Sequence, residues 1–195
     1  MLEIRKYRQE DEVGWVRCRT LSFLDTAYYD NVLKEKEKYE NPAIELVAVI
    51  ENNIVGLLDI EYEIQEGKVC TRGKGVGGMI WHIAVHPDFR RRGIGKKLLF
   101  RAEEISKEAG LNYLEAWTRD DEWVNRWYDT NDFDKQESYL QVFIDGAELK
   151  GVIKSNIPKL YPVLTFAHYV GEDGDEIKKK YKRTHECFCY EKRLI

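Results

Sequence analysis

The fold of this chain is decided by one stretch, Ile80-Trp81-His82-Ile83-Ala84-Val85-His86-Pro87-Asp88-Phe89-Arg90-Arg91-Arg92-Gly93-Ile94-Gly95-Lys96-Lys97-Leu98-Leu99. Its first residues are apolar and rich in β-branched types, which predicts a buried strand. Pro87 ends that strand because proline has no N–H to give to a sheet. Apolar residues at helical spacing begin at Leu98 and continue to Ala109. A strand therefore leads through a tight basic turn into the N-terminus of a helix.

The turn between this strand and helix has the composition of an anion-binding site. Backbone N–H groups converge at a helix N-terminus, where the helix dipole adds partial positive charge. Gly93 and Gly95 have no side chain, so an anion can approach the backbone closely. These features predict a pyrophosphate cradle. The alternative is a plain strand–helix turn that uses glycine for geometry and arginine for solubility.

The spacing in this turn differs from that of the common nucleotide-binding loops, because neither G-x-x-x-x-G-K-[ST] nor G-x-G-x-x-G is present. Instead, Arg90 opens the pattern R-x-x-G-x-G, and Val85 and Pro87 precede it. The string Ile83 to Gly95 resembles the coenzyme A loop of the GNAT (GCN5-related N-acetyltransferase) superfamily. The resemblance covers residues 1 to about 144 and the last strand. It implies an α/β acyl-CoA N-acyltransferase fold, in which a central, mostly antiparallel sheet of about seven strands carries helices on both faces.

The same resemblance implies that acetyl-CoA is the co-substrate. Backbone amides from Arg90 to Lys96 would hold the pyrophosphate, and the arginines would add charge-assisted bonds. The backbone of Ile83 to Val85 would pair with the pantetheine arm and polarise the thioester carbonyl. The implied cofactor-binding residues are Ile83, Ala84, Val85, Arg90, Arg91, Arg92, Gly93, Ile94, Gly95, Lys96 and Asn125. No metal is expected.

A general acid is implied by the stretch from Trp123 to Phe133, which is similar to the family pattern N-x-x-x-x-Y-x-x-x-x-F. The spacing from Tyr128 to Phe133 is kept, whereas Asn125 stands closer to the tyrosine than in the family, and Asp132 replaces a glycine. Tyr128 would protonate the departing thiolate, which a phenol can do because its ordinary pKa is about 10. The alternative is a core tyrosine whose hydroxyl bonds to the backbone.

The general base has several candidates. The resemblance points to Glu115, since some protein N-terminal acetyltransferases carry a glutamate at or near that position. His82 lies in the central strand, and its ordinary pKa of about 6.5 suits a base. A water relay is a further alternative. Three carboxylates alternate along an expected strand and form either a solvated face or an acidic wall for a cationic amine: Asp59, Glu61 and Glu63.

The remaining chain is expected to form a single domain, residues 1–195, with an insertion at about 145–184 between the last two strands. The pattern predicts a second N-terminal helix over about 21–39, a hairpin whose turn is Asn52-Asn53, a glycine-rich loop over 66–78 and a helix over 172–183. The insertion either shapes the acceptor pocket or serves as a packing extension or dimer surface, so a homodimer is left open.

Composition narrows the classes of partner. The net charge of −4 argues against nucleic acid. No apolar run approaches the ~18–20 residues of a membrane span, and the N-terminus lacks the apolar core of a signal peptide. The four cysteines are expected to be buried and free, although the C-x-C pair Cys187 and Cys189 could bind metal. These features predict a cytoplasmic protein.

The leading hypothesis is therefore an acetyl-CoA-dependent N-acetyltransferase that acetylates a primary amine of a small molecule or peptide by direct attack. Its partners would be acetyl-CoA and an amine acceptor, with no nucleic acid and no membrane. The alternative is a non-catalytic acyl-CoA-binding or regulatory module on the same fold, because fold does not fix function. A protein-interaction module built on the insertion is a third hypothesis.

Overall fold

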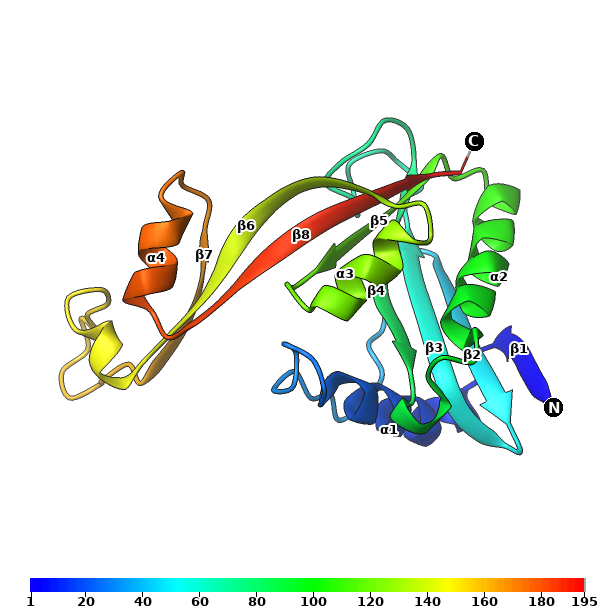
Figure 1. Ribbon diagram of the computed structural model, residues 1–195, viewed down its shortest axis with the longest axis horizontal. Coiled ribbons are helices and arrows are strands. Elements are labelled where there is room, and N and C mark those ends of the chain that lie inside the picture. The colour runs from blue at the N-terminus through cyan, green and yellow to red at the C-terminus, as the bar shows by residue number, and fades with distance from the viewer. Residues whose placement is uncertain (195) are drawn as a thin grey trace. The chain divides into compact units, whose positions relative to one another are not determined.

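A computed structural model describes residues 1–194, which form two compact units (Figure 1). The first unit comprises Met1–Gln136 and the chain from Cys189 onward, and the second is Glu137–Phe188. The first unit contains β1 (Leu2–Lys6), α1 (Glu12–Phe23), β2 (Ala43–Ile50), β3 (Asn53–Tyr62), β4 (Gly77–Val85), α2 (Ile94–Glu108), β5 (Tyr113–Thr118) and α3 (Glu122–Asp129). Short 3-10 turns at Gln9–Asp11 and Pro87–Phe89 precede α1 and α2.

Two strands belong partly to each unit, namely β6 (Asp134–Asp145) and β8 (Arg183–Arg193). The second unit also contains a 3-10 turn (Gly146–Leu149), β7 (Leu164–Tyr169) and α4 (Gly174–Lys180). Its own small core consists of Leu140, Val142, Ile144, Leu149 and Tyr181.

The strands are hydrogen-bonded in the order β1-β2-β3-β4-β5-β8-β6-β7. The pairs β1–β2, β2–β3, β3–β4 and β6–β7 are antiparallel, and β4–β5 is parallel. The predicted mixed, mostly antiparallel sheet is confirmed, with eight strands where about seven were expected. The additional strand, β7, lies within the predicted insertion and carries the aromatic residues Phe166, His168 and Tyr169.

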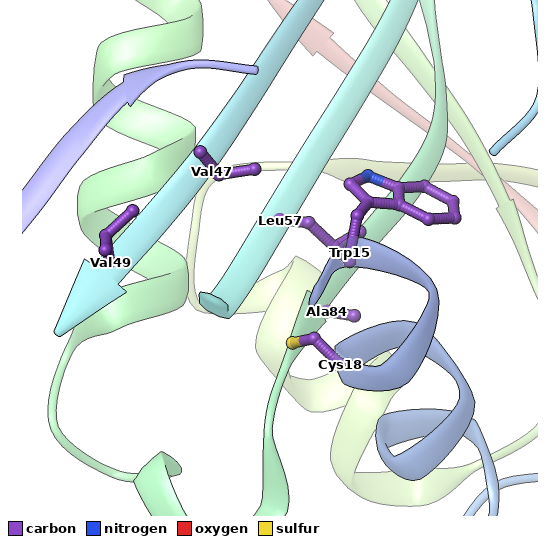
Figure 2. Close-up of a cluster of buried hydrophobic side chains, with 6 residues drawn as sticks. All are labelled: Trp15, Cys18, Val47, Val49, Leu57 and Ala84. Carbon is purple, nitrogen blue, oxygen red and sulfur yellow. The ribbon is translucent and has the colours of Figure 1, made fainter. Parts of the chain in front are cut away.

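Helices cover both faces of the sheet, as predicted. Figure 2 shows Trp15 and Cys18 of α1 beside Val47, Val49, Leu57 and Ala84, which together form a buried cluster. The helix α2 packs on the opposite face, against Gly56 of β3. A Cβ built on Gly56 would lie 3.0 Å from Ile94 Cγ2 and 3.1 Å from Leu98 Cδ1. The missing side chain therefore lets the first turn of α2 approach the sheet.

Filling this contact should weaken the fold. We expect Gly56→Ala to lower the free energy of unfolding by ~1–3 kcal/mol, because extra volume in a close-packed contact forces neighbours to shift. Gly95→Ala is the matched control, since a Cβ there would meet nothing closer than Trp127 Nε1 at 3.6 Å. Urea unfolding of both variants measures the difference, and equal stabilities would contradict this packing.

Two local predictions need correction. The hairpin turn between β2 and β3 lies one residue earlier than predicted, at Glu51 and Asn52, whose φ angles are 49° and 63°. The helix predicted over 21–39 is wrong, because α1 ends at Phe23. The Thr26 hydroxyl donates to the Phe23 carbonyl at 2.8 Å and accepts from the Tyr28 N–H at 3.1 Å. Such side-chain bonds compete with helical ones.

The remaining expected elements are present with small shifts. The glycine-rich loop occupies residues 63–76, and the helix predicted over 172–183 is the shorter α4. Gly110 follows α2 with a φ of 79°, the left-handed conformation in which glycine commonly ends a helix. None of the helices within residues 1–194 combines the length and the apolar character that crossing a bilayer requires.

Candidate active site

The central feature of the site is the point where β4 and β5 stop pairing. Their parallel register runs from Gly77 opposite Tyr113 to Ile80 opposite Ala116, and no further pair follows in the described chain. On its other side β4 stays paired with β3 as far as Val85. The edge of β4 that faces β5 is therefore left without a strand partner from Trp81 to Val85 (Figure 1). An extended ligand arm can pair with such an edge as an added strand does.

The cradle predicted after β4 has the geometry of an anion site. Gly93 adopts a left-handed conformation with a φ of 72° and serves as the N-cap of α2. The Lys97 N–H donates to the Gly93 carbonyl at 3.1 Å. The N–H groups of Ile94, Gly95 and Lys96 precede this bond and have no acceptor within the helix. Three amide donors and the positive end of the helix dipole are thus presented together.

Two of the three arginines are engaged by the protein itself. The Arg90 guanidinium donates to Asp25 Oδ2 at 2.9 Å and to the Ser22 carbonyl at 2.8 Å. The Arg92 guanidinium donates to the Asp88 carbonyl at 2.9 Å. Arg91 is exposed and has a positive φ of 61°. The guanidinium groups of Arg90 and Arg92 therefore hold the turn in shape.

Tyr128 lies in α3 among aromatic rings. Its ring stacks on Tyr190 with a centroid distance of 4.9 Å, and Phe133 and Trp127 meet it edge-on at 5.1 and 5.2 Å. Burial, with a smaller contribution from Tyr190, raises the pKa of the Tyr128 phenol above its ordinary value. Its hydroxyl makes no hydrogen bond to any residue within 1–194. Aromatic rings therefore surround the Tyr128 ring, while its hydroxyl donates its proton to no acceptor within residues 1–194.

Asn125 holds the start of α3 in place. Its amide nitrogen donates to the Arg119 carbonyl at 2.7 Å and to the Asp121 carbonyl at 2.9 Å. Its amide oxygen accepts from the Tyr190 hydroxyl at 2.9 Å. These contacts fix the helix that carries Tyr128. Asp132, which replaces the family's glycine, has a positive φ of 62°, a conformation that aspartate tolerates better than most residues.

Glu115 is fully buried and acts as an anchor for the loop 63–76. Its carboxylate accepts bonds from the Thr71 hydroxyl at 2.6 Å, the Arg72 N–H at 2.8 Å and the Trp117 indole at 2.8 Å. Glu63 binds the same loop through the N–H groups of Val69, Cys70 and Gly77. Both carboxylates have their lone pairs occupied by protein donors.

The three alternating carboxylates in and just after β3 do not form a solvated face, so that alternative is wrong. Asp59, Glu61 and Glu63 are 0%, 8% and 2% exposed. The Asp59 carboxylate forms an ion pair with Lys36 at 2.9 Å and accepts from the Tyr39 hydroxyl at 3.0 Å. Lys36 is itself buried beneath the rings of Tyr7, Trp15 and Tyr39.

His82 lies opposite Asp59 in the β3–β4 register and is 6% exposed. Its Nδ1 accepts from Arg19 Nε at 3.3 Å, and its Nε2 bonds to Glu37. Glu37 was missed from the sequence, because the segment around it was expected to be helical and carried no motif. The structure brings His82 and Glu37 together, whereas Glu115 makes its hydrogen bonds to the loop and to Trp117.

A pocket of about 400 Å³ opens beside this pair. It is lined by Glu37, Lys38, Tyr39, Glu40, Asn41, Glu61, Lys68, Val69 and Trp81. Trp81 is the first β4 residue beyond the last pair with β5, and the β3–β4 register shifts at this point. Such bulges re-aim side chains next to active sites. The pocket therefore adjoins the unpaired edge of β4.

Comparison with known proteins decides the family. The pattern of the Acetyltransferase (GNAT) family matches residues 9–133. The chain belongs to the GNAT acetyltransferase family. An acetyltransferase of Pectobacterium atrosepticum is 30% identical over 124 residues, which are 62% of this chain and 78% of that protein. The prediction of the superfamily and of an N-acetyltransferase is thereby confirmed.

Solved structures show the same fold as this GNAT chain. The PaiA N-acetyltransferase of Thermoplasma acidophilum, solved in complex with coenzyme A, has a TM-score of 0.59 at 14% identity and covers 99% of both chains. The ribosomal-protein-S18-alanine N-acetyltransferase of Escherichia coli has a TM-score of 0.60 at 12% identity, and the superposition covers 100% of this chain and 94% of that one.

The cysteines of this GNAT chain are all free and buried, namely Cys18, Cys70, Cys187 and Cys189. Burial raises the pKa of the Cys18 thiol to about 11, which keeps it protonated and unreactive. Within residues 1–194, no cluster of three or more histidine, cysteine, aspartate or glutamate side chains is arranged to hold a metal ion.

Proposed function

We propose that this chain transfers the acetyl group of acetyl-CoA to a primary amine by direct attack. One observation carries the proposal: β4 parts from β5 after Ile80, its edge on that side has no strand partner as far as Val85, and the chain then leads through a short turn to the amide donors of α2. The extended thioester arm of acetyl-CoA needs a free strand edge, and its pyrophosphate needs amide donors that follow that edge in the chain. The open space at Gly95, where a Cβ would meet no atom within 3.5 Å, fits the close approach of a phosphate.

In this proposal the protein supplies three kinds of group. The amides of Ile94, Gly95 and Lys96 hold the pyrophosphate, and the β4 backbone from Ile83 to Val85 holds the pantetheine arm and polarises the carbonyl. The amine attacks the carbonyl carbon, and the C–S bond breaks as the tetrahedral intermediate collapses. Tyr128 gives its proton to the departing sulfur.

The proton of the amine requires a different route from those first expected. Glu115 could accept it only by releasing the loop that it anchors, and both nitrogens of His82 are already bonded. We propose that a water molecule in the pocket carries this proton to solvent, and that Glu115 has a structural role. The free cysteines suit a reducing compartment, so we propose a cytoplasmic location.

The enzyme hypothesis predicts that free thiol appears when the protein, acetyl-CoA and a reactive primary amine are combined. Thiol release from a panel of alkylamines, arylamines and short peptides measures this directly. We expect one thiol per acetylated amine and little release without an amine. Tight coenzyme A binding with no release for any amine would instead favour the non-catalytic module.

A further inference from the structure

We propose that the Glu37 carboxylate binds the ammonium group of the acceptor, and that His82 positions this carboxylate. The acceptor class is then an aliphatic primary amine, which is protonated at neutral pH, and not an arylamine, which is neutral. This inference rests on the proposed acetyl transfer and specifies the acceptor of the same reaction. The bound ammonium gives one proton to the pocket water before the neutral amine attacks, and the second proton leaves by the same water after the C–N bond forms.

The location of Glu37 is the first argument. Its carboxylate lines the pocket that adjoins the unpaired edge of β4, where the thioester is proposed to lie. The Glu37 side chain is 46% exposed, in contrast to the buried Glu61. Glu61 is already occupied, because it accepts from Asn41 at 2.8 and 3.0 Å and from the Trp81 indole at 2.9 Å.

The hydrogen bonds of His82 are the second argument. Arginine Nε carries a hydrogen and can only donate, so the Arg19 contact makes His82 Nδ1 an acceptor. The proton of a neutral His82 then lies on Nε2, which donates it to Glu37 Oε2. Arg19 is itself fixed, because it donates to the Asn31 carbonyl at 2.7 Å and to Asn31 Oδ1 at 3.0 Å. These bonds fix both the tautomer and the orientation of the His82 imidazole.

The unused oxygen of Glu37 is the third argument. One oxygen accepts from His82, and Glu37 Oε1 has no hydrogen-bond partner within residues 1–194. The bond from His82 lowers the pKa of the Glu37 carboxyl, which keeps the carboxylate ionised at neutral pH. The ring of Trp81, which is half-exposed on the same pocket, offers an aromatic face to a cation.

The charges around the pocket are mixed, and they differ in their contacts. Lys38, Glu40 and Lys68 are exposed side chains at its rim. Glu37 is the lining carboxylate that both contacts the β4 histidine and retains a free oxygen. The ammonium is therefore expected at Glu37, and the rest of the acceptor toward the rim.

Steady-state kinetics with two simple amines test this assignment. For n-butylamine, which is cationic, we expect Glu37→Gln to raise KM by about 10–100-fold, the usual range for loss of a charge-assisted hydrogen bond. For aniline, which is neutral and is expected to be a poor acceptor for the unmodified protein as well, we expect kcat/KM to change by less than about threefold, a change worth under ~0.7 kcal/mol. Glu35→Gln is the matched control, since Glu35 is an exposed carboxylate of the same segment outside the pocket lining. An unchanged KM for n-butylamine in Glu37→Gln would overturn the proposal.

A pair of His82 variants tests the positioning role. His82→Gln retains an amide N–H that can donate to Glu37, and His82→Leu removes the donor. We expect His82→Leu to raise the KM for n-butylamine nearly as much as Glu37→Gln, and His82→Gln to restore most of the affinity. Equal defects in both folded variants would contradict positioning through this hydrogen bond.

Direct binding separates this inference from the proposed reaction. Calorimetric titration of n-butylamine into the protein saturated with coenzyme A needs no turnover. Weaker binding to Glu37→Gln than to Glu35→Gln would support the assignment even if no amine released thiol. Equal binding to both variants, together with normal thiol release, would reject Glu37 and leave the acetyltransferase proposal intact.

Discussion

Tyr128→Phe should lower kcat by ~10²–10⁴-fold, which is the usual contribution of general acid catalysis. Phenylalanine keeps the stacking on Tyr190 and the edge contacts with Phe133 and Trp127 but removes the proton. The affinity for acetyl-CoA should change little, because the hydroxyl acts in the transition state. The loss should shrink with a thioester whose thiol is more acidic, since a better leaving group needs less protonation.

Tyr190→Phe is the informative comparison, because its hydroxyl has a structural partner. That hydroxyl donates to Asn125 Oδ1, so its removal should cost ~0.5–1.5 kcal/mol of stability. The Tyr128 hydroxyl has no partner within residues 1–194, so Tyr128→Phe should retain its melting temperature. Measuring melting temperature and kcat on the same preparations distinguishes the two roles. A Tyr128→Phe variant with unchanged kcat would assign the acid to water or to another residue.

Gly95→Asp should weaken coenzyme A binding by at least about 100-fold. A carboxylate in the first turn of α2 would stand within about 5 Å of the pyrophosphate, where charge repulsion at an effective dielectric constant near 20 costs about 3 kcal/mol. The fold should not suffer, because an acidic residue is favourable near a helix N-terminus. Isothermal titration with coenzyme A, and a thermal melt of the free protein, measure both effects.

Gly95→Asn separates charge from volume, since asparagine has nearly the shape of aspartate. We expect its affinity for coenzyme A to fall far less than that of Gly95→Asp. Wild-type affinity in a folded Gly95→Asp protein would show that the pyrophosphate binds elsewhere.

The cradle could be predicted from the sequence because its determinants are local. Pro87 ends the strand, Gly93 supplies the left-handed N-cap, and the apolar spacing sets the direction of α2. All lie within one short stretch, so their effects do not depend on distant residues. The strands of the sheet could be predicted for the same reason, because alternating apolar residues and flanking turn residues mark each strand locally.

The side-chain contacts on the proposed acceptor side of the site could not be predicted in the same way. Glu37 acquires its role from His82, which is 45 residues away, and Arg19 orients that histidine from another element. The family resemblance pointed to Glu115 as a base, but its hydrogen-bond partners Thr71 and Arg72 belong to the glycine-rich loop, whose fold is not visible in the sequence pattern. Hydrogen bonds between distant side chains leave no periodic signal in the sequence.

The first unit is built from two separate stretches of the chain, and this affects the order in which its parts can form during translation. Tyr190 packs on Tyr128 and bonds to Asn125, yet it is translated only after the whole of Glu137–Phe188. The aromatic surroundings of Tyr128 are therefore incomplete while the ribosome is still adding that segment. A nascent chain halted near residue 180 would have the cradle of α2 but lack the Tyr190 ring that stacks on Tyr128, the proposed acid. During synthesis, the capacity to hold the pyrophosphate should appear before the capacity to transfer the acetyl group.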